Sequence, residues 1–267
     1  MMMLDFFILV MIGLAMGFFG GLLGIGGSVV MIPAMVVFFR RRPEDQHLFQ
    51  AAAMICNFFV GLTAAVVHRR ENALVVGTLR WLVPAAAAGI IAGVWLSNRR
   101  LFSAGGSTNL TRCFGAFLVY VAVYNFIKLR NDRESPAKLP DRGSGGVLAS
   151  LIGLVTGLSA GLLGTGGGTV STPMQQFLLA MPLKNAISNS AAVISVTALI
   201  GAMYKNLTLS AHGIAMTESL KIAAVVIPAA IVGSFAGGRI LHRLPRHVVR
   251  AVFAALLTLA AARLLAG

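Results

Sequence analysis

The N-terminal part of the chain contains an apolar segment that is too long to be one straight membrane helix. No Lys, Arg, His or Glu interrupts residues 4–39, and a single helix of that length would extend about 54 Å at 1.5 Å per residue. A bilayer core about 30 Å thick needs only about 20 helical residues. A glycine cluster at residues 24–27, followed by Pro33, weakens the helix within this segment, because glycine lowers helix propensity and proline removes a backbone hydrogen bond. We therefore predict a broken or re-entrant helix.

The same element occurs again 140 residues further along the chain. Residues 17–35 and residues 157–175 agree at nine of nineteen positions. The shared residues, numbered in the first copy, are Gly17, Gly21, Leu22, Leu23, Gly24, Gly26, Gly27, Val30 and Pro33. The second copy also lies in an over-long apolar segment, residues 147–180. Two copies at a fixed spacing predict an internal repeat in which each half begins with a broken helix.

The composition places the chain in a membrane. Hydrophobic residues make up 57% and charged residues 11% of the chain, with a mean hydropathy of +0.85, whereas soluble proteins carry roughly 25% charged residues. The net charge of +14 comes from Lys and Arg in the predicted loops, where they meet anionic lipid headgroups. We therefore predict an all-α polytopic membrane protein that contacts the lipid bilayer and binds no nucleic acid.

The predicted spans divide into two homologous halves of four membrane units each. We expect a first transmembrane repeat at residues 1–129, a polar linker at 130–146 and a second repeat at 147–267. Besides the two broken segments, the predicted spans are residues 48–67, 74–96, 110–127, 183–203, 220–241 and 248–265. If each first unit is a hairpin, each half crosses the membrane an odd number of times and the repeats are inverted; four full spans would make them parallel. The distribution of Lys and Arg slightly favours inverted repeats.

The two glycine clusters are the predicted solute site. A helix that restarts after a glycine break presents unpaired N–H groups and the positive end of its dipole, and glycine lets a ligand approach the backbone. The expected contacts at the breaks are Gly24, Gly26, Gly27, Ser28, Gly164, Thr165, Gly166, Gly167, Gly168 and Thr169. Polar residues of neighbouring spans complete the expected set: Gln50, Asn57, Asn189 and Ser190. The alternatives are that the glycines allow close helix packing and that the polar side chains only bond between helices.

The acidic residues indicate the charge of the solute. None of the eight Asp and Glu residues falls in the middle of a predicted span. A cation carrier or proton relay usually needs a buried carboxylate, so we expect an anion held by backbone N–H and hydroxyl groups. We expect no cofactor and no metal ion, and we interpret Cys56 and Cys113 as small apolar packing residues.

These motifs resemble the TauE/SafE family of membrane permeases. The resemblance rests on residues 21–28 with Pro33, on residues 161–168 with Pro173, and on residues 186–190. It implies a multi-pass protein of the bacterial inner (plasma) membrane that moves sulfite or an organosulfonate such as sulfoacetate. Half one carries Ile25, Ser28 and Ala51 where half two has Thr165, Gly168 and Ser190. We therefore expect more polar ligand contacts from half two.

The function we expect is transport of a small sulfur-containing anion by alternating access between the two repeats. One alternative is a permease or channel for another small anion or a neutral solute. A remote alternative is a membrane-embedded enzyme that uses Ser188 or Ser190 with His212; we expect no enzyme. The expected partners are the anionic substrate and the bilayer, with a homodimer left open.

Overall fold

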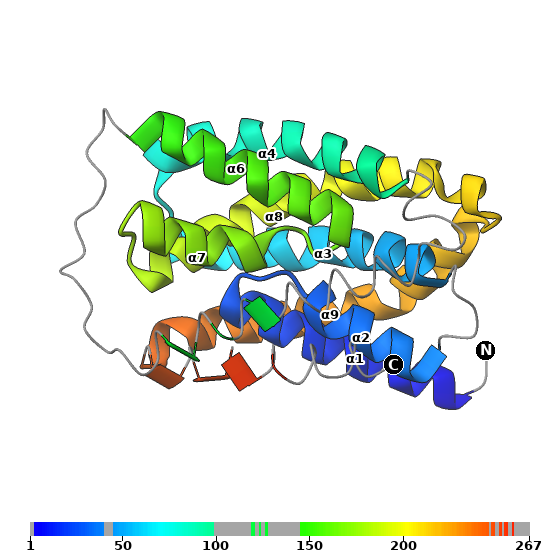
Figure 1. The fold of residues 1–267 in the computed structure, drawn as a ribbon. Helices are drawn as coiled ribbons and strands as arrows, with labels where there is room; N and C mark the ends of the chain where they lie inside the picture. Colours follow the sequence, from blue (N-terminus) through cyan, green and yellow to red (C-terminus); the bar gives the residue numbers. More distant parts are fainter. Residues whose placement is uncertain are drawn as a thin grey trace.

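The computed structural model describes residues 3–39, 45–98 and 145–245, together with single positions between 119 and 127 and between 247 and 258. These residues form helices joined by turns, with no strand among them (Figure 1). The elements are α1 (Met3–Leu23), α2 (Ser28–Phe39), α3 (Asp45–Arg70), α4 (Val76–Ser97), α6 (Gly145–Leu163), α7 (Gly168–Leu178), α8 (Leu183–Leu207), the 3-10 helix η1 (Leu209–His212) and α9 (Met216–Arg243). Most of the predicted spans at 110–127 and 248–265 lies outside the described residues, as does the predicted linker except Gly145 and Gly146, which begin α6.

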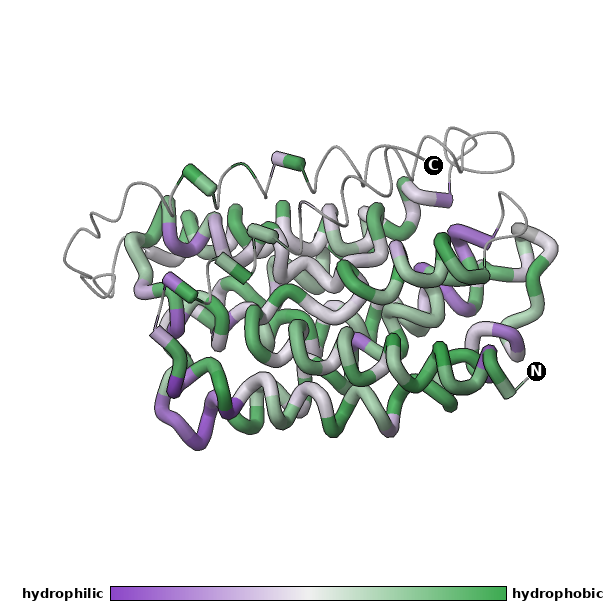
Figure 2. Tube along the Cα trace, turned by 90° about the horizontal axis from the view of Figure 1, so that it is seen from below, coloured by the Kyte–Doolittle hydropathy of each residue, from purple (hydrophilic) through white to green (hydrophobic). Residues whose placement is uncertain are grey.

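Within the described part of the chain, six helices are long and apolar enough to cross a membrane: α1, α3, α4, α6, α8 and α9. This confirms the predicted all-helical, multi-pass class. Apolar residues cover the length of the bundle, and hydrophilic residues gather mostly toward its two ends (Figure 2). Several helices are longer than the apolar runs that predicted them. For example, α3 begins at Asp45 and ends at Arg70, because a helix that leaves the hydrocarbon core continues with charged residues among the headgroups.

Both over-long apolar segments are interrupted at their glycines. Helix α1 ends at Leu23 and α2 begins at Ser28, while α6 ends at Leu163 and α7 begins at Gly168. Five glycines in the links have positive φ: Gly24 (59°), Gly26 (74°), Gly164 (75°), Gly166 (72°) and Gly167 (92°). Side chains disfavour this left-handed conformation, so these links require glycine. In Figure 1, α2 turns back beside α1, and α7 turns back from the end of α6.

Helices from the N-terminal half of the chain pack against helices from the C-terminal half. Helix α1 lies along α9, α4 lies along α6, and α3 lies against α8 between these two pairs (Figure 1). Close approach depends on glycine. A Cβ on Gly17 would collide with the backbone of Ala230 in α9, and a Cβ on Gly157 would collide with that of Ala86 in α4. These contacts are the small-residue packing common between membrane helices.

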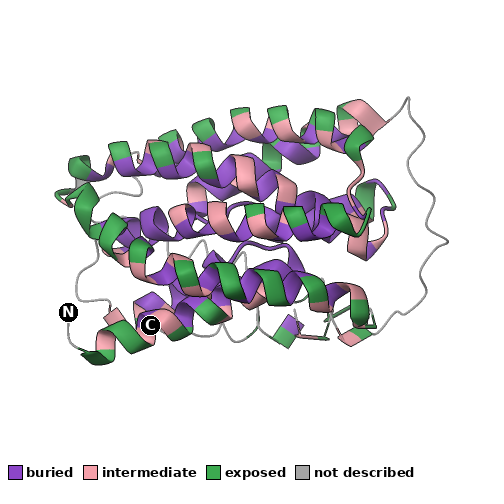
Figure 3. Ribbon diagram, turned by 180° about the vertical axis from the view of Figure 1, so that it is seen from behind, coloured by how far each residue is buried: buried purple, intermediate pink, exposed green. Residues whose placement is uncertain are grey.

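The central pair of helices is the buried part of the bundle. Figure 3 shows α3 and α8 mostly buried and the outward faces of the surrounding helices exposed. The exposed faces carry large apolar side chains such as Phe7, Trp95 and Val232, as lipid contact requires. The polar residues Gln50, Asn57 and Asn189 are fully buried, so the polar groups of this membrane protein are turned inward.

Candidate functional site

The two glycine links touch each other inside the bundle. Gly168, the first residue of α7, lies so close to the Gly24 carbonyl oxygen and to Ile25 Cα that a Cβ would collide with both. A Cβ on Gly26 would lie 2.8 Å from the Thr165 carbonyl oxygen. We call residues 24–28 and 164–169 together the glycine crossing. It brings together the beginnings of α2 and α7, two segments about 140 residues apart.

Two polar side chains from the central helices hold the glycine crossing. Asn57 of α3 accepts a hydrogen bond from the Ser28 N–H through Oδ1 (3.1 Å), which caps the start of α2. Thr197 of α8 donates its hydroxyl to the Gly166 carbonyl oxygen (2.9 Å). The sequence prediction included Asn57 but missed Thr197. The repeat contained the signal, since the offset of 140 that aligns Gly61 with Gly201 also aligns Asn57 with Thr197.

Several buried polar atoms at the glycine crossing have no hydrogen-bond partner among the described residues. They are Ser28 Oγ, Gln50 Oε1, Asn57 Nδ2 and Thr169 Oγ1, and all four side chains are fully buried. All four residues belong to the predicted site. Nearly all buried polar groups in folded proteins are hydrogen-bonded, and the first N–H groups of α2 and α7 lack acceptors within their own helices. The crossing therefore offers hydrogen-bonding capacity that a polar ligand would use.

Other predicted residues at the breaks are occupied by contacts within the protein. The Gln50 side-chain amide donates to the Leu163 carbonyl oxygen (3.4 Å), and Gly164 packs against the stem of the same Gln50 side chain. The Thr165 hydroxyl accepts the Gly167 N–H (3.4 Å). Gly167 itself packs on Thr156 of α6.

Gly27 makes a contact like that of Gly167. It packs on Met16 of α1, where a Cβ would lie 2.7 Å from the Met16 carbonyl oxygen. At Gly27 and Gly167, the close-packing alternative describes the contacts.

Asn189 and Ser190 bond to α7 and to the turn before α4 rather than to the glycine crossing. Asn189 accepts the Val75 N–H (2.9 Å) and donates to Gln175 Oε1 (3.1 Å). Ser190 Oγ accepts hydrogen bonds from Thr172 (2.9 Å) and Gln175 (3.2 Å). These contacts match the alternative in which the polar residues of α8 bond between helices.

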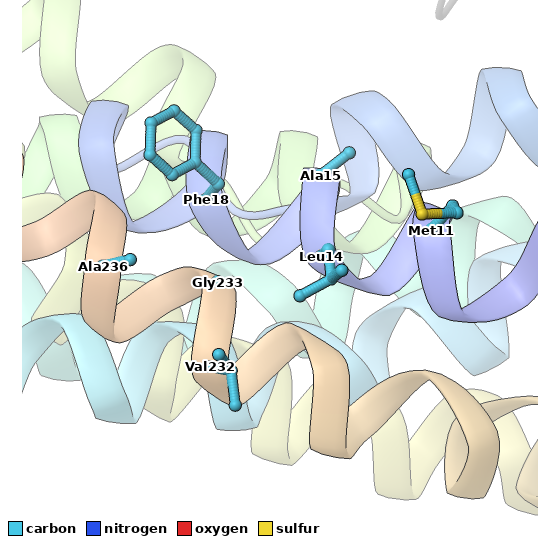
Figure 4. Close-up of a pocket in the computed structure, with 7 residues that line it drawn as sticks. All are labelled: Met11, Leu14, Ala15, Phe18, Val232, Gly233 and Ala236. Atoms are coloured by element: carbon cyan, nitrogen blue, oxygen red, sulfur yellow. The ribbon is translucent and has the colours of Figure 1, made fainter.

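A separate groove lies between α1 and α9. Figure 4 shows its lining, which consists of Met11, Leu14, Ala15, Phe18, Val232, Gly233 and Ala236. These residues contribute no polar side chain, and several are exposed on the outer face. The groove therefore has the character of an apolar surface in contact with lipid. It shares no residue with the predicted site.

The fold defines a polytopic helical membrane protein with a polar crossing at its centre. The chain belongs to the family described as sulfite exporter TauE/SafE, whose profile it matches over residues 9–264.

Curated relatives agree with this class. The chain is 26% identical to probable membrane transporter protein MamO of Paramagnetospirillum magneticum, over 96% of this chain and 44% of that protein. It is 27% identical to probable membrane transporter protein MJ0441 of Methanocaldococcus jannaschii, over 90% of this chain and 88% of that protein. It thus spans less than half the length of MamO but most of MJ0441. No solved structure matches the chain.

Proposed function

We propose that the protein is a secondary transporter of a small sulfur-containing anion, sulfite or an organosulfonate such as sulfoacetate, which binds at the glycine crossing. The observation that carries this proposal is the group of unpartnered, fully buried polar atoms contributed by both breaks and by α3. The membrane helices, the family and the transporter names of the relatives support the same class. The substrate class follows the description of the family.

The chemistry of the glycine crossing suits an anion with several oxygens. The beginnings of α2 and α7 each carry a partial positive charge of roughly half an elementary charge. The hydroxyls of Ser28 and Thr169 and the side-chain amide of Asn57 are unpartnered donors. Sulfite and a sulfonate group each present three oxygen acceptors. No Asp or Glu occurs among the residues of the crossing, so no carboxylate there repels such a solute.

The transport cycle we propose uses two inverted repeats, residues 1–129 and 147–267, joined by the polar linker 130–146. The helix order supports two repeats, because α1 to α4 and α6 to α9 both consist of a long, a short and two further long helices in that order. The helix directions support their inversion. In Figure 1, α1 and α6 run in opposite directions, as do α3 and α8, and α4 and α9. The hairpins α1–α2 and α6–α7 are then re-entrant. Rocking of one repeat against the other exposes the crossing to each side of a bacterial inner membrane in turn.

One observation favours a second candidate, a permease for another small solute that is neutral. The unpartnered atom of Gln50 is an acceptor, Oε1, and an acceptor suits a solute that carries hydrogen-bond donors. Counterflow in proteoliposomes, with sulfite and with neutral amides on the opposite side, separates these candidates and also distinguishes a carrier from a channel.

The test of the site replaces two hydroxyls that have no partner. Ser28→Ala and Thr169→Val each remove such a group while changing side-chain volume little, so we expect the unliganded protein to keep its thermal stability. We expect each variant to lose most of the stabilisation that sulfite, sulfoacetate, taurine or isethionate gives the wild type, and to transport at least tenfold less, since one hydrogen bond to a charged group contributes about 1.5–3 kcal/mol.

The matched control is Ser234→Ala. The Ser234 hydroxyl donates to the Val60 carbonyl oxygen (2.8 Å) at the α3–α9 contact, and neither residue belongs to the crossing. We expect this variant to lose about 1 kcal/mol of stability and to keep ligand-dependent stabilisation. Unchanged ligand responses in Ser28→Ala and Thr169→Val would remove the crossing as the binding site. A wild type that responds to none of these four sulfur compounds would contradict the substrate class.

A further inference from the structure

Among the described residues, a buried lysine lies outside the glycine crossing. Lys205 of α8 is 1% exposed, and its Nζ donates to the hydroxyl of Ser97, the last residue of α4, at 2.8 Å. An ammonium group has three donors. In the part of the chain that the structure describes, Nζ has this one hydrogen bond and no carboxylate partner. Ionisable residues that face the interior of a membrane protein commonly mark the path of a solute.

Lys205 lies on the same face of α8 as the residue that holds the second break. Thr197, Gly201 and Lys205 follow one another at intervals of four, which places them along one side of the helix. Thr197 bonds to Gly166 in the glycine crossing. Lys205 is eight residues further along, or about 12 Å at 1.5 Å per residue. It therefore lies about two helical turns from the crossing. We call this face of α8, which carries Thr197, Gly201 and Lys205, the seam.

Apolar side chains close the seam between these two points. At Gly201 a Cβ would lie 2.7 Å from Ile90 Cδ1 and 2.9 Å from Met54 Sδ. Met54 and Ile90 are fully buried and belong to one apolar cluster with Val94. The structure thus has a polar crossing, a closely packed apolar cluster and a buried lysine in that order along α8.

The charge of Lys205 has a specific effect at this end of the bundle. Helices α4 and α8 both end close to it, and helix C-termini carry partial negative charge, which would repel an anion leaving the crossing. The ammonium offsets that repulsion. At the offset of 140, the position of Lys205 is Ala65 in the first half, so the matching position there carries no cation.

We propose that Lys205 is a second, transient binding site for the transported oxyanion, at the exit of the seam between α4 and α8. The proposal rests on the proposed function and deepens it. The anion passes the apolar cluster of Met54 and Ile90 and is received by the ammonium before it reaches water. Because Ala65 takes the matching position in the first half, this binding step belongs to one side of the protein.

The experiment compares three variants reconstituted in proteoliposomes with sulfite and sulfoacetate as solutes. Lys205→Gln removes the charge but keeps a donor for Ser97, Lys205→Arg keeps the charge, and Ser97→Ala keeps the lysine but removes its partner. We expect Lys205→Gln to lower kcat/KM at least tenfold, and Lys205→Arg and Ser97→Ala to stay within threefold of the wild type. We also expect Lys205→Gln to keep the solute-dependent thermal stabilisation, because the crossing is intact.

The outcomes separate this proposal from the proposed function. A wild type without solute-dependent stabilisation would contradict binding at the crossing, whatever Lys205 does. Wild-type transport by Lys205→Gln would overturn the role of Lys205 alone. Equal losses in Lys205→Gln and Ser97→Ala would also overturn it, since Lys205 would then serve only to tie α4 to α8. If Lys205→Gln does not fold, Ser97→Ala decides. The proposal requires Ser97→Ala to transport like the wild type, whereas a purely structural link between α4 and α8 predicts that it loses transport.

Discussion

At the scale of single residues, the glycine crossing depends on the absence of side chains at a few positions. Glycine is needed for two different reasons. Gly24, Gly26, Gly164 and Gly166 adopt positive φ, whereas Gly168 has no such φ and is instead pressed against the backbone of the other break. A substitution at Gly168 therefore tests the contact between the breaks without the added strain of a left-handed backbone.

We predict opposite effects of alanine at two glycines that begin or nearly begin a helix. In Gly168→Ala, the new Cβ meets the Gly24 carbonyl oxygen and lies 2.6 Å from Ile25 Cα, so the two breaks must separate. We expect a loss of about 1–3 kcal/mol and loss of transport. In Gly77→Ala, the Cβ has nothing within 4 Å, and we expect a gain of up to about 1 kcal/mol from helix propensity. Unfolding of both variants in one detergent checks this; a stable, active Gly168→Ala protein would contradict the crossing.

The sequence points more directly to the residues of the crossing than to the hydrogen-bond partners of the polar residues beside it. Ser28 and Thr169 follow directly from the position of the breaks, because they are the first residue of α2 and the second residue of α7, the helices that restart there. Asn189 and Ser190 were chosen for polarity alone, and the structure bonds them to α7 residues and Val75. A polar side chain within a span needs a hydrogen-bond partner. The sequence does not identify that partner, because it belongs to a different helix.

At the scale of elements, the breaks were predictable and the helix pairing was not. Glycine and proline act locally, so the interruptions after Leu23 and Leu163 follow from the chain itself. The pairing of α1 with α9 and of α4 with α6 joins a helix of the first half to a helix of the second half in each case. These helices carry apolar residues all round, with large ones exposed on the lipid side, so hydrophobicity does not mark the face that meets a neighbour.

Cysteine pairs test this interleaved pairing. A Cβ on Gly13 of α1 would lie 3.0 Å from Ala229 Cβ of α9, and a Cβ on Gly153 of α6 would lie 3.0 Å from Ala85 Cβ of α4. In a background without Cys56 and Cys113, we expect each double-cysteine variant to form a disulfide. A Cβ on Gly13 would also lie 2.7 Å from the Val226 carbonyl oxygen, and one on Gly153 would collide with that of Leu82, so the helices must separate slightly. This separation moves the paired Cβ atoms toward the spacing of about 3.5–4.5 Å found in disulfides. Cleavage at a protease site inserted between residues 130 and 144 then leaves the two fragments joined until a reductant is added. Fragments that separate under oxidising conditions would refute the pairing.

At the scale of the whole molecule, the direction of the helices decides how the halves relate. The turn between α3 and α4 and the η1 turn between α8 and α9 lie at opposite ends of the bundle in Figure 1. The sequence left inverted and parallel halves open, because the Lys and Arg residues that orient membrane proteins are spread through loops on both sides. Most of the last predicted span of each half, residues 110–127 and 248–265, lies outside the described residues.

Labelling from one side of the membrane distinguishes the two arrangements. Glu71, after α3, and Ser210, in η1, are exposed. With single cysteines at these positions in the cysteine-free background, we expect a membrane-impermeant maleimide to label Glu71→Cys from one side of the membrane and Ser210→Cys from the other. Labelling after solubilisation in detergent controls for reactivity. Labelling of both from the same side would indicate parallel repeats and refute the proposed cycle.

The contact between the breaks also limits how such a protein can originate by duplication. Ser28 and Gly168 occupy matching positions in the two copies, yet Gly168 admits no side chain, whereas the Ser28 hydroxyl is buried with no hydrogen-bond partner in the described part of the chain. A pair of identical half-length subunits would carry one residue type at both positions, so it would lack either the hydroxyl or the close contact. A serine in one copy and a glycine in the other requires two different sequences, and a single chain that holds both copies supplies them. Fusion of the halves therefore allows one copy to specialise in polar contacts and the other in close fit.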